Sequence, residues 1–157
     1  MNLKITQKDI EQIQFEWGES VVNIGELFIQ NKDFKKAAEI HVEKFYGYHD
    51  NVVLFKPTKV SQIQFRTTLK SAVSYFVGGN SSFPEDHGFA LQPWTNVRFE
   101  NSGFVINNDS ALAMGNYYFT DLDGNETKVE YTFGYYLSES GVLKINVHHS
   151  SVPFNNK

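Results

Sequence analysis

The sequence contains no cysteine, no cluster of basic residues and no long apolar run. The missing thiols exclude disulfide bonds, cysteine nucleophiles and thiolate metal sites. With 14 Lys and Arg against 18 Asp and Glu, the net charge of -4 argues against a nucleic-acid-binding surface. No apolar segment approaches the length that crosses a bilayer, and residues 1–9 lack the apolar centre of a signal peptide. These absences predict a cytoplasmic protein with no membrane or nucleic-acid partner.

Aromatic side chains, in contrast, are plentiful: 14 Phe and 8 Tyr are present. They favour strands and pocket walls. A length of 157 residues is enough to bury one sizeable core, so a single domain over residues 1–157 is expected.

The first half of the chain shows helical periodicity. Thr6 and Asp9 resemble a capping box, and the apolar residues that follow recur every three or four positions up to about Gln30. Gly18 and Gly25 weaken this helix, which suggests that another element approaches it closely. A second helix should start after Asp33, and a third should run from about Thr67 to Phe76 and end at Gly78-Gly79. Between them, residues 52–55 form a short strand.

Everything after Gly88 has the pattern of antiparallel strands, with a hairpin signal at Asp123-Gly124. The expected strands are 89–100, a second one that begins at 104–107 and continues over 111–120, then 128–137 and 142–151. Helices followed by a long antiparallel meander predict an α+β domain, whose strongly curved sheet wraps around the first helix.

The most informative segment is His148-His149-Ser150-Ser151, where the last expected strand becomes polar. Strand side chains alternate between faces, so His148 and Ser150 share one face. An imidazole beside a hydroxyl can hold and move a proton near neutral pH. On the motif alone, the frayed and solvated end of an edge strand is the favoured explanation.

The apolar pattern of the same strand creates a conflict. Leu143, Ile145 and Val147 alternate with His148, so a regular strand would place the histidine on the face opposite to theirs. Either a bulge before His148 shifts the register, or a partner subunit covers the outer face. The sequence leaves both alternatives open.

Local spacing does not support a histidine metal site. The five histidines are His41, His49, His87, His148 and His149. Neighbouring strand residues point apart, and no other pair has a ligand spacing. Carboxylates such as Glu130 or Asp86 could still complete a zinc or manganese site, but a site without metal or other cofactor is the better interpretation.

Several segments together resemble a known family. They are Trp17-Gly18-Glu19, Tyr46-Gly47-Tyr48, Val53–Thr58, Arg66-Thr67-Thr68, Ser74–Asn80, Glu85–Ala90, Ala113–Thr120, Val129–Tyr135 and His148–Ser151. Spread over nearly the whole chain, they resemble the NTF2-like cone-shaped α+β fold, the group of the calcium/calmodulin-dependent kinase II association domain, and most closely the iota class of carbonic anhydrase.

The resemblance implies reversible hydration of carbon dioxide to bicarbonate. It places contacts to bicarbonate and the reacting water at Thr58, Tyr75 and Ser150, with His148 nearby. From the residues alone, Thr58 could be an ordinary turn hydroxyl and Tyr75 a core aromatic. Arg66 could bind an anionic product, but it is expected at the surface. If His148 supplies the base, the activity should rise with pH through an inflection at about 6 to 7.

Two other functions compete with the enzyme. One is a non-catalytic assembly domain, and the other is a pocket for another small ligand. The joint occurrence of the four candidate residues favours the enzyme. A homodimer is also expected, with the aromatic segments 117–119 and 131–136 as its predicted surface.

Overall fold

A computed structural model describes residues 3–156. Its longest helix, α1, spans Gln7–Ile29 and starts with the predicted capping box. The Thr6 hydroxyl accepts a hydrogen bond from the backbone N–H of Asp9, and the Asp9 carboxylate accepts one from the backbone N–H of Thr6. These two bonds satisfy amide groups that a helix end otherwise leaves unpaired.

The two shorter helices also begin at side-chain caps. Helix α2 spans Phe34–Phe45 behind Asp33, as predicted. Helix α3 spans Leu69–Val77 and begins slightly later than predicted, because Thr68 and Ser71 cap each other's backbone amides. It ends at Gly78, whose φ of 63° is one that glycine adopts readily.

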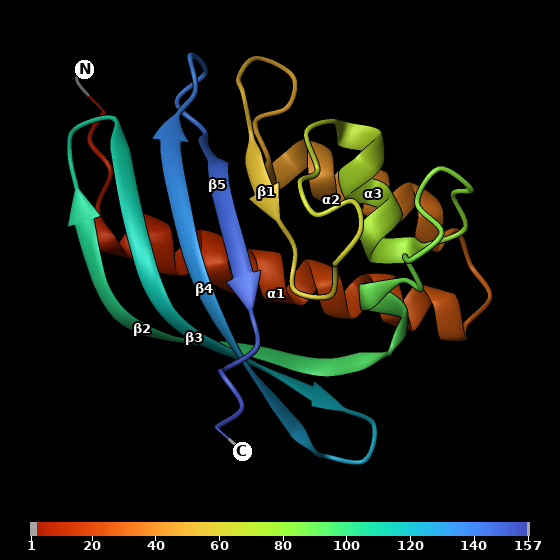
Figure 1. Ribbon diagram of the computed structural model, residues 1–157. Helices are drawn as coiled ribbons and strands as arrows, with labels where there is room; N and C mark the ends of the chain where they lie inside the picture. The colour runs from red at the N-terminus through yellow and green to blue at the C-terminus, as the bar shows by residue number, and fades with distance from the viewer. Residues whose placement is uncertain (1–2, 157) are drawn as a thin grey trace.

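Five strands form one sheet in the order β1-β5-β4-β3-β2. Their bounds are β1 Leu54–Lys56, β2 Trp94–Ile106, β3 Ser110–Asp121, β4 Glu126–Leu137 and β5 Leu143–Ser151. Strands β2 to β5 are antiparallel, whereas β1 pairs in parallel with β5 at the sheet edge (Figure 1). The prediction of helices followed by an antiparallel meander is therefore confirmed.

The predicted boundary between the first two strands of the meander is wrong. Residues Phe89–Leu91 form a separate 3-10 turn, and β2 then runs without a break through Asn101 and Gly103. The pairing register shifts between Asn101 and Gly103, so the expected break between two strands is a bulge within β2. The actual hairpin turn lies at residues 107–109.

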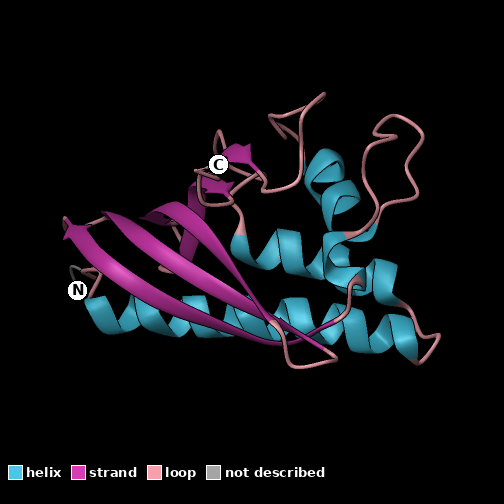
Figure 2. Ribbon diagram, turned by 60° about the horizontal axis from the view of Figure 1, so that its bottom comes forward, coloured by secondary structure: helices cyan, strands magenta, loops and turns pink. Residues whose placement is uncertain are grey.

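The sheet curves around α1, as Figure 2 shows. Both glycines of the helix lie at close approaches, as predicted. A Cβ atom on Gly18 would lie 3.0 Å from the Cβ of Val97 in β2, and one on Gly25 would lie 2.7 Å from the carbonyl oxygen of Ala90. The small residues let the sheet and the 3-10 turn reach the helix backbone.

The aromatic residues of β3 and β4 form the core between sheet and helix. Tyr117, Phe119, Tyr131, Phe133 and Tyr135 are all buried. Much of the aromatic surface predicted for a subunit interface is thus turned inward. Within residues 3–156, no helix has both the length and the apolar character needed to span a bilayer.

Candidate active site

A bulge in β5 decides which face carries the polar motif. Gly134 of β4 pairs with Val147, but the next residue, Tyr135, pairs with Ile145, so Asn146 has no partner in the ladder. This extra residue changes the alternation, and Ile145, His148 and Ser150 are all buried on the inner face. The first of the two alternatives left open by the sequence is therefore correct.

Hydrogen bonds link the polar residues of the inner face into a chain. The Tyr46 hydroxyl lies 2.8 Å from His148 Nδ1, and the Tyr117 hydroxyl lies 3.1 Å from His148 Nε2. The Tyr117 hydroxyl also lies 2.5 Å from Ser150 Oγ, which in turn lies 2.6 Å from Thr58 Oγ1. Five side chains from α2's C-terminus, β5, β3 and the end of β1 thus make one continuous chain of polar contacts.

The imidazole of His148 is held between two phenyl rings. Its ring centroid is 4.7 Å from that of Phe55, at an interplanar angle of 9°, and 4.1 Å from that of Phe133. Burial in these apolar surroundings keeps the pKa of His148 well below its ordinary value, with smaller contributions from His41 and His149. A ring with so low a pKa is neutral at physiological pH and would not by itself give the activity the expected inflection at about 6 to 7.

Thr58 reaches this chain because β1 lies beside β5. Phe55 pairs with His148 and Lys56 with His149, so the chain leaves β1 close to Ser150. The ammonium group of Lys56 donates a hydrogen bond of 2.9 Å to the carbonyl oxygen of Ser150. The edge strand is thereby connected to the end of the polar motif.

The segment after Thr58 is anchored by one carboxylate. Glu85 accepts hydrogen bonds from the backbone N–H groups of Ser61, Gln62 and Ile63, the shortest of them 2.7 Å long. These backbone hydrogen bonds lower the pKa of Glu85. The anchor fixes the loop that carries Thr58 and Lys59.

Tyr75 on α3 approaches the same loop from the other side. Its hydroxyl accepts a hydrogen bond of 3.2 Å from the backbone N–H of Lys59, next to Thr58. Its ring stacks on Phe89 with centroids 5.5 Å apart. Burial raises the pKa of the phenol, so Tyr75 keeps its proton and can donate it in a hydrogen bond.

A small cavity opens at Thr58. It has a volume of about 120 Å³, and its walls include Phe89, Trp94, Phe119 and Val129. A second cavity, of about 230 Å³, touches Tyr75 and shares Lys59, Phe89 and Gln92 with the first. The structure therefore brings all four predicted residues to one region, and Thr58 and Tyr75 each line a cavity there.

Comparisons with known proteins identify the family of this chain. The model of the family described as metal-independent carbonic anhydrase matches residues 8–152. A curated metal-independent carbonic anhydrase from Nostoc sp. (strain PCC 7120) is 40% identical, over 98% of this chain and 77% of the relative. The chain belongs to the metal-independent carbonic anhydrase family.

Solved structures agree with this assignment. A crystal structure of a cyanobacterial iota-carbonic anhydrase complexed with bicarbonate is 38% identical and superposes with a TM-score of 0.94, covering 98% of this chain and 95% of that one. A putative calcium/calmodulin-dependent protein kinase II association domain from Xanthomonas campestris has a TM-score of 0.59 at 21% identity, covering 96% and 94%. This second likeness concerns the fold alone, and the predicted NTF2-like α+β fold is confirmed.

No cluster of metal-ligating side chains lies at the candidate site or elsewhere in residues 3–156. Within the described part of the chain, no three His, Asp or Glu residues lie close enough together to hold an ion. The two carboxylates considered for such a site are used elsewhere. Asp86 binds Arg66, and Glu130 accepts a hydrogen bond from Ser151 on the outer face of the sheet.

Arg66 is a correction to the sequence analysis, which expected it at the surface. The side chain is fully buried, and two of its guanidinium nitrogens each lie 2.7 Å from a carboxylate oxygen of Asp86. Ser74 on α3 donates a third hydrogen bond to the same carboxylate. The ion pair joins α3 to the loop before Phe89 and is not available to an anionic product.

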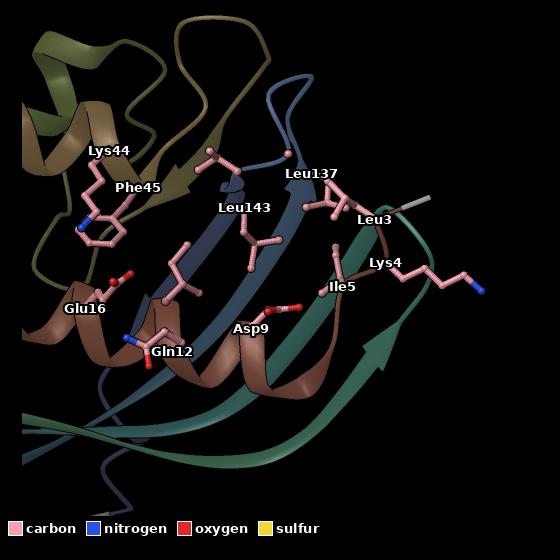
Figure 3. A pocket seen from close by; sticks show the side chains of 13 residues that line it. Leu3, Lys4, Ile5, Asp9, Gln12, Glu16, Lys44, Phe45, Leu137 and Leu143 are labelled. Atoms are coloured by element: carbon pink, nitrogen blue, oxygen red, sulfur yellow. The ribbon is translucent and has the colours of Figure 1, made fainter. Parts of the chain in front are cut away.

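A separate cavity of about 280 Å³ lies between the first turns of α1 and the start of β5 (Figure 3). Leu3 and Ile5 line it together with Leu137 and Leu143, and charged side chains such as Lys44 and Glu16 surround it. None of the four predicted site residues reaches it. This cavity therefore does not contain the polar chain described above.

Sequence reasoning missed Tyr46, which contacts Nδ1 of His148, and Tyr117, which contacts Nε2. Both lie in segments that carry the family resemblance. A tyrosine among many buried aromatic residues gives no sign, however, that its hydroxyl has a polar partner. Only the fold, which places residues 46 and 117 on either side of residue 148, reveals their part in the site.

Proposed function

We propose that this chain catalyses the reversible hydration of carbon dioxide to bicarbonate without a metal ion, at Thr58, Tyr75, Ser150 and His148. The observation that carries the proposal is the hydroxyl chain from Tyr117 through Ser150 to Thr58, which ends at a small cavity with aromatic walls. A homologue complexed with bicarbonate supports the same substrate. One domain carries all four residues.

The chemistry requires a water oxygen to attack the carbon atom of carbon dioxide. Electrons of one C=O bond then move onto oxygen, and the attacking water loses a proton to solvent or buffer. Hydroxyl groups that donate hydrogen bonds to the oxygens stabilise this developing negative charge. We assign this role to Thr58 and Tyr75, because both residues line the cavities around Lys59.

In this mechanism His148 acts through hydrogen bonds rather than as a charged acid. It is buried and neutral, and it contacts Ser150 only through Tyr117. The aromatic walls keep bulk water away from the reacting atoms, which strengthens the hydrogen bonds made to them.

The test is stopped-flow measurement of carbon dioxide hydration with protein that has been treated with chelator and analysed for bound metal. Hydration by metal-free protein supports the proposal. Activity that disappears on chelation and returns with zinc or manganese contradicts the metal-free mechanism but keeps the enzyme class. Absence of activity under every metal condition overturns the function and favours an assembly domain.

We also propose that the protein forms a homodimer through the outer face of its sheet. One row of paired residues crosses all five strands of the sheet. From β1 to β2 it consists of Leu54, Val147, Gly134, Leu112 and Val105. Leu54, Leu112 and Val105 are 62%, 49% and 58% exposed. This row of apolar residues on the outer face, interrupted only by the buried Gly134, supports a homodimer in place of the aromatic surface expected from the sequence.

Sedimentation tests the dimer. The wild-type protein is expected to sediment as a dimer, and Leu112→Glu as a monomer, because the charge would be buried in the interface. Leu122→Glu is the control, since Leu122 is 65% exposed in a hairpin turn away from this row of residues. A wild-type protein that is monomeric at micromolar concentration would contradict the proposal.

A further inference from the structure

We propose that Tyr46 and Tyr117 fix the direction of the hydrogen bonds at the active site, so that Thr58 presents a hydrogen, and not a lone pair, to the substrate. Tyr117 is then a positioning residue for the reaction. The inference rests on the proposed function and adds residues that act through Ser150 and Thr58. It follows from counting donors and acceptors along the chain.

The count starts at Trp17, because an indole N–H can only donate. Trp17 Nε1 donates a hydrogen bond of 3.1 Å to the hydroxyl of Tyr46, which is itself buried. Among the described residues, the only other hydrogen-bond partner of this hydroxyl is His148 Nδ1, at 2.8 Å. The Tyr46 hydrogen is therefore satisfied only if the hydroxyl donates to Nδ1.

Three protonation states of His148 can be compared on this basis. With the proton on Nε2, Nδ1 accepts from Tyr46 and every buried donor has a partner. With the proton on Nδ1, the Tyr46 oxygen would accept from both Trp17 and His148, and its own buried hydrogen would have no partner. The doubly protonated ring has the same defect and adds a buried charge. The neutral Nε2–H form is therefore favoured.

From His148 the direction of every further bond is determined. Nε2–H donates to the Tyr117 oxygen at 3.1 Å, so the Tyr117 hydrogen is free to donate to Ser150 Oγ at 2.5 Å. Ser150 then donates to Thr58 Oγ1 at 2.6 Å. The Thr58 hydrogen has no acceptor among these five side chains and is left for a group at the adjoining cavity, either the nearby Tyr75 hydroxyl or the substrate.

Packing prevents the ring from escaping this arrangement. Phe55 and Phe133 stack on its two faces, and Trp17 contacts it edge-on with centroids 5.8 Å apart. A rotated ring would place carbon atoms opposite the two tyrosine hydroxyls. The direction set at Tyr46, deep in the core, is thus transmitted through His148 and Tyr117 to Thr58 at the cavity.

The consequence is specific for Tyr117. Without its hydroxyl, Ser150 Oγ would receive no hydrogen and could accept the one on Thr58, which would turn away from the cavity. Tyr117→Phe should therefore weaken bicarbonate binding and lower kcat/KM for both directions of the reaction by about 10- to 100-fold. Tyr131→Phe is the matched control, because Tyr131 is also buried and lies beside Tyr117, yet its hydroxyl binds Asn101.

The experiment combines these kinetics with ¹⁵N NMR of the histidine rings in the wild-type protein. The expected spectrum shows a proton on Nε2 of His148 and none on Nδ1. Because it is recorded on the wild-type protein, this result does not depend on whether Tyr117→Phe folds. A proton on Nδ1, or a folded Tyr117→Phe as active as Tyr131→Phe, would overturn the inference. An inactive wild-type protein would instead refute the proposed function, and the NMR result would still decide the protonation state.

Discussion

Thr58 and Ser150 are 92 residues apart in the sequence, yet their hydroxyl oxygens lie 2.6 Å apart. Two features of the fold make this contact. The short strand β1 pairs in parallel with β5, and the bulge at Asn146 turns Ser150 to the inner face. A hydroxyl pair produced by two such irregular features, beside a cavity lined by Thr58, supports the proposed site.

The first prediction concerns two serines that are neighbours in β5. Ser150→Ala removes the link between Tyr117 and Thr58 and should lower carbon dioxide hydration by about 100- to 1000-fold, because Thr58, the donor at the cavity, loses the hydrogen bond that orients it. Ser151→Ala is the control, since this hydroxyl contacts Glu130 on the outer face. Stopped-flow assays and melting temperatures of both variants provide the measurement. Equal activity of the two variants would show that the site lies elsewhere.

The second prediction concerns pH. Because burial lowers the pKa of His148, its ring stays neutral from pH 6 to 8, and the hydration rate should show no inflection there from this residue. His148→Ala should lose activity equally at every pH in that range. His149→Ala should keep the wild-type profile, because His149 is exposed on the opposite face. An inflection at about 6 to 7 that disappears only in His148→Ala would contradict this expectation.

Much of the fold could be predicted because its signals are local. The caps at Thr6 and Asp33, the Gly124 hairpin and the close approach at Gly18 each depend on a few neighbouring residues. The alternation rule also placed His148 and Ser150 on one face.

The parts that could not be predicted depend on distant partners. β1 has three residues, too few to show which strand it joins, and its partner lies more than ninety positions later. The unpaired Asn146 has no distinctive sequence pattern, and Arg66 looks like a surface residue until Asp86 is found beside it. The tyrosines around His148 depend on the same long-range assembly.

The third prediction concerns the buried ion pair of Arg66 and Asp86. Asp86→Asn keeps the shape of the side chain but leaves the guanidinium without its counter-charge, in a place where both side chains are fully buried. We expect a loss of about 3–5 kcal/mol in the free energy of unfolding, measured in urea. Glu126→Gln breaks the exposed pair with Arg98 and should change stability little. If the two substitutions lowered the free energy of unfolding by similar amounts, burial would not be what makes the Arg66–Asp86 pair costly to break.

The last prediction concerns His41, a buried histidine outside the polar chain. Its Nδ1 lies 2.7 Å from Ser20 Oγ, but its Nε2 has no hydrogen-bond partner among residues 3–156, and Phe76 lies against the ring with centroids 4.7 Å apart. Burial, together with a smaller effect of Lys44, lowers the pKa of His41 to about 3. The ring is therefore neutral in the folded protein at physiological pH.

This depressed pKa links the stability of the fold to pH. The unfolded chain binds a proton at His41 below about pH 6.5, whereas the folded chain does not until near its own lower pKa. The contribution to stability is thus complete above the unfolded pKa and is lost as the pH falls toward the folded one. Between pH 7 and pH 5, His41 should remove about 2 kcal/mol from the free energy of unfolding.

His41→Phe isolates this effect, because phenylalanine fills a similar space among the surrounding rings and does not titrate. Urea unfolding at pH 7 and pH 5 should show a smaller loss in the variant than in the wild-type protein, with the remainder due to His148 and the carboxylates. His149→Ala, which changes an exposed ring, should lose as much stability as the wild type. His41 is only 1% exposed, within a cluster of aromatic rings. If His41→Phe and the wild type lost the same amount of stability between pH 7 and pH 5, His41 would have to be protonated or solvated in the folded state, and the prediction would be wrong.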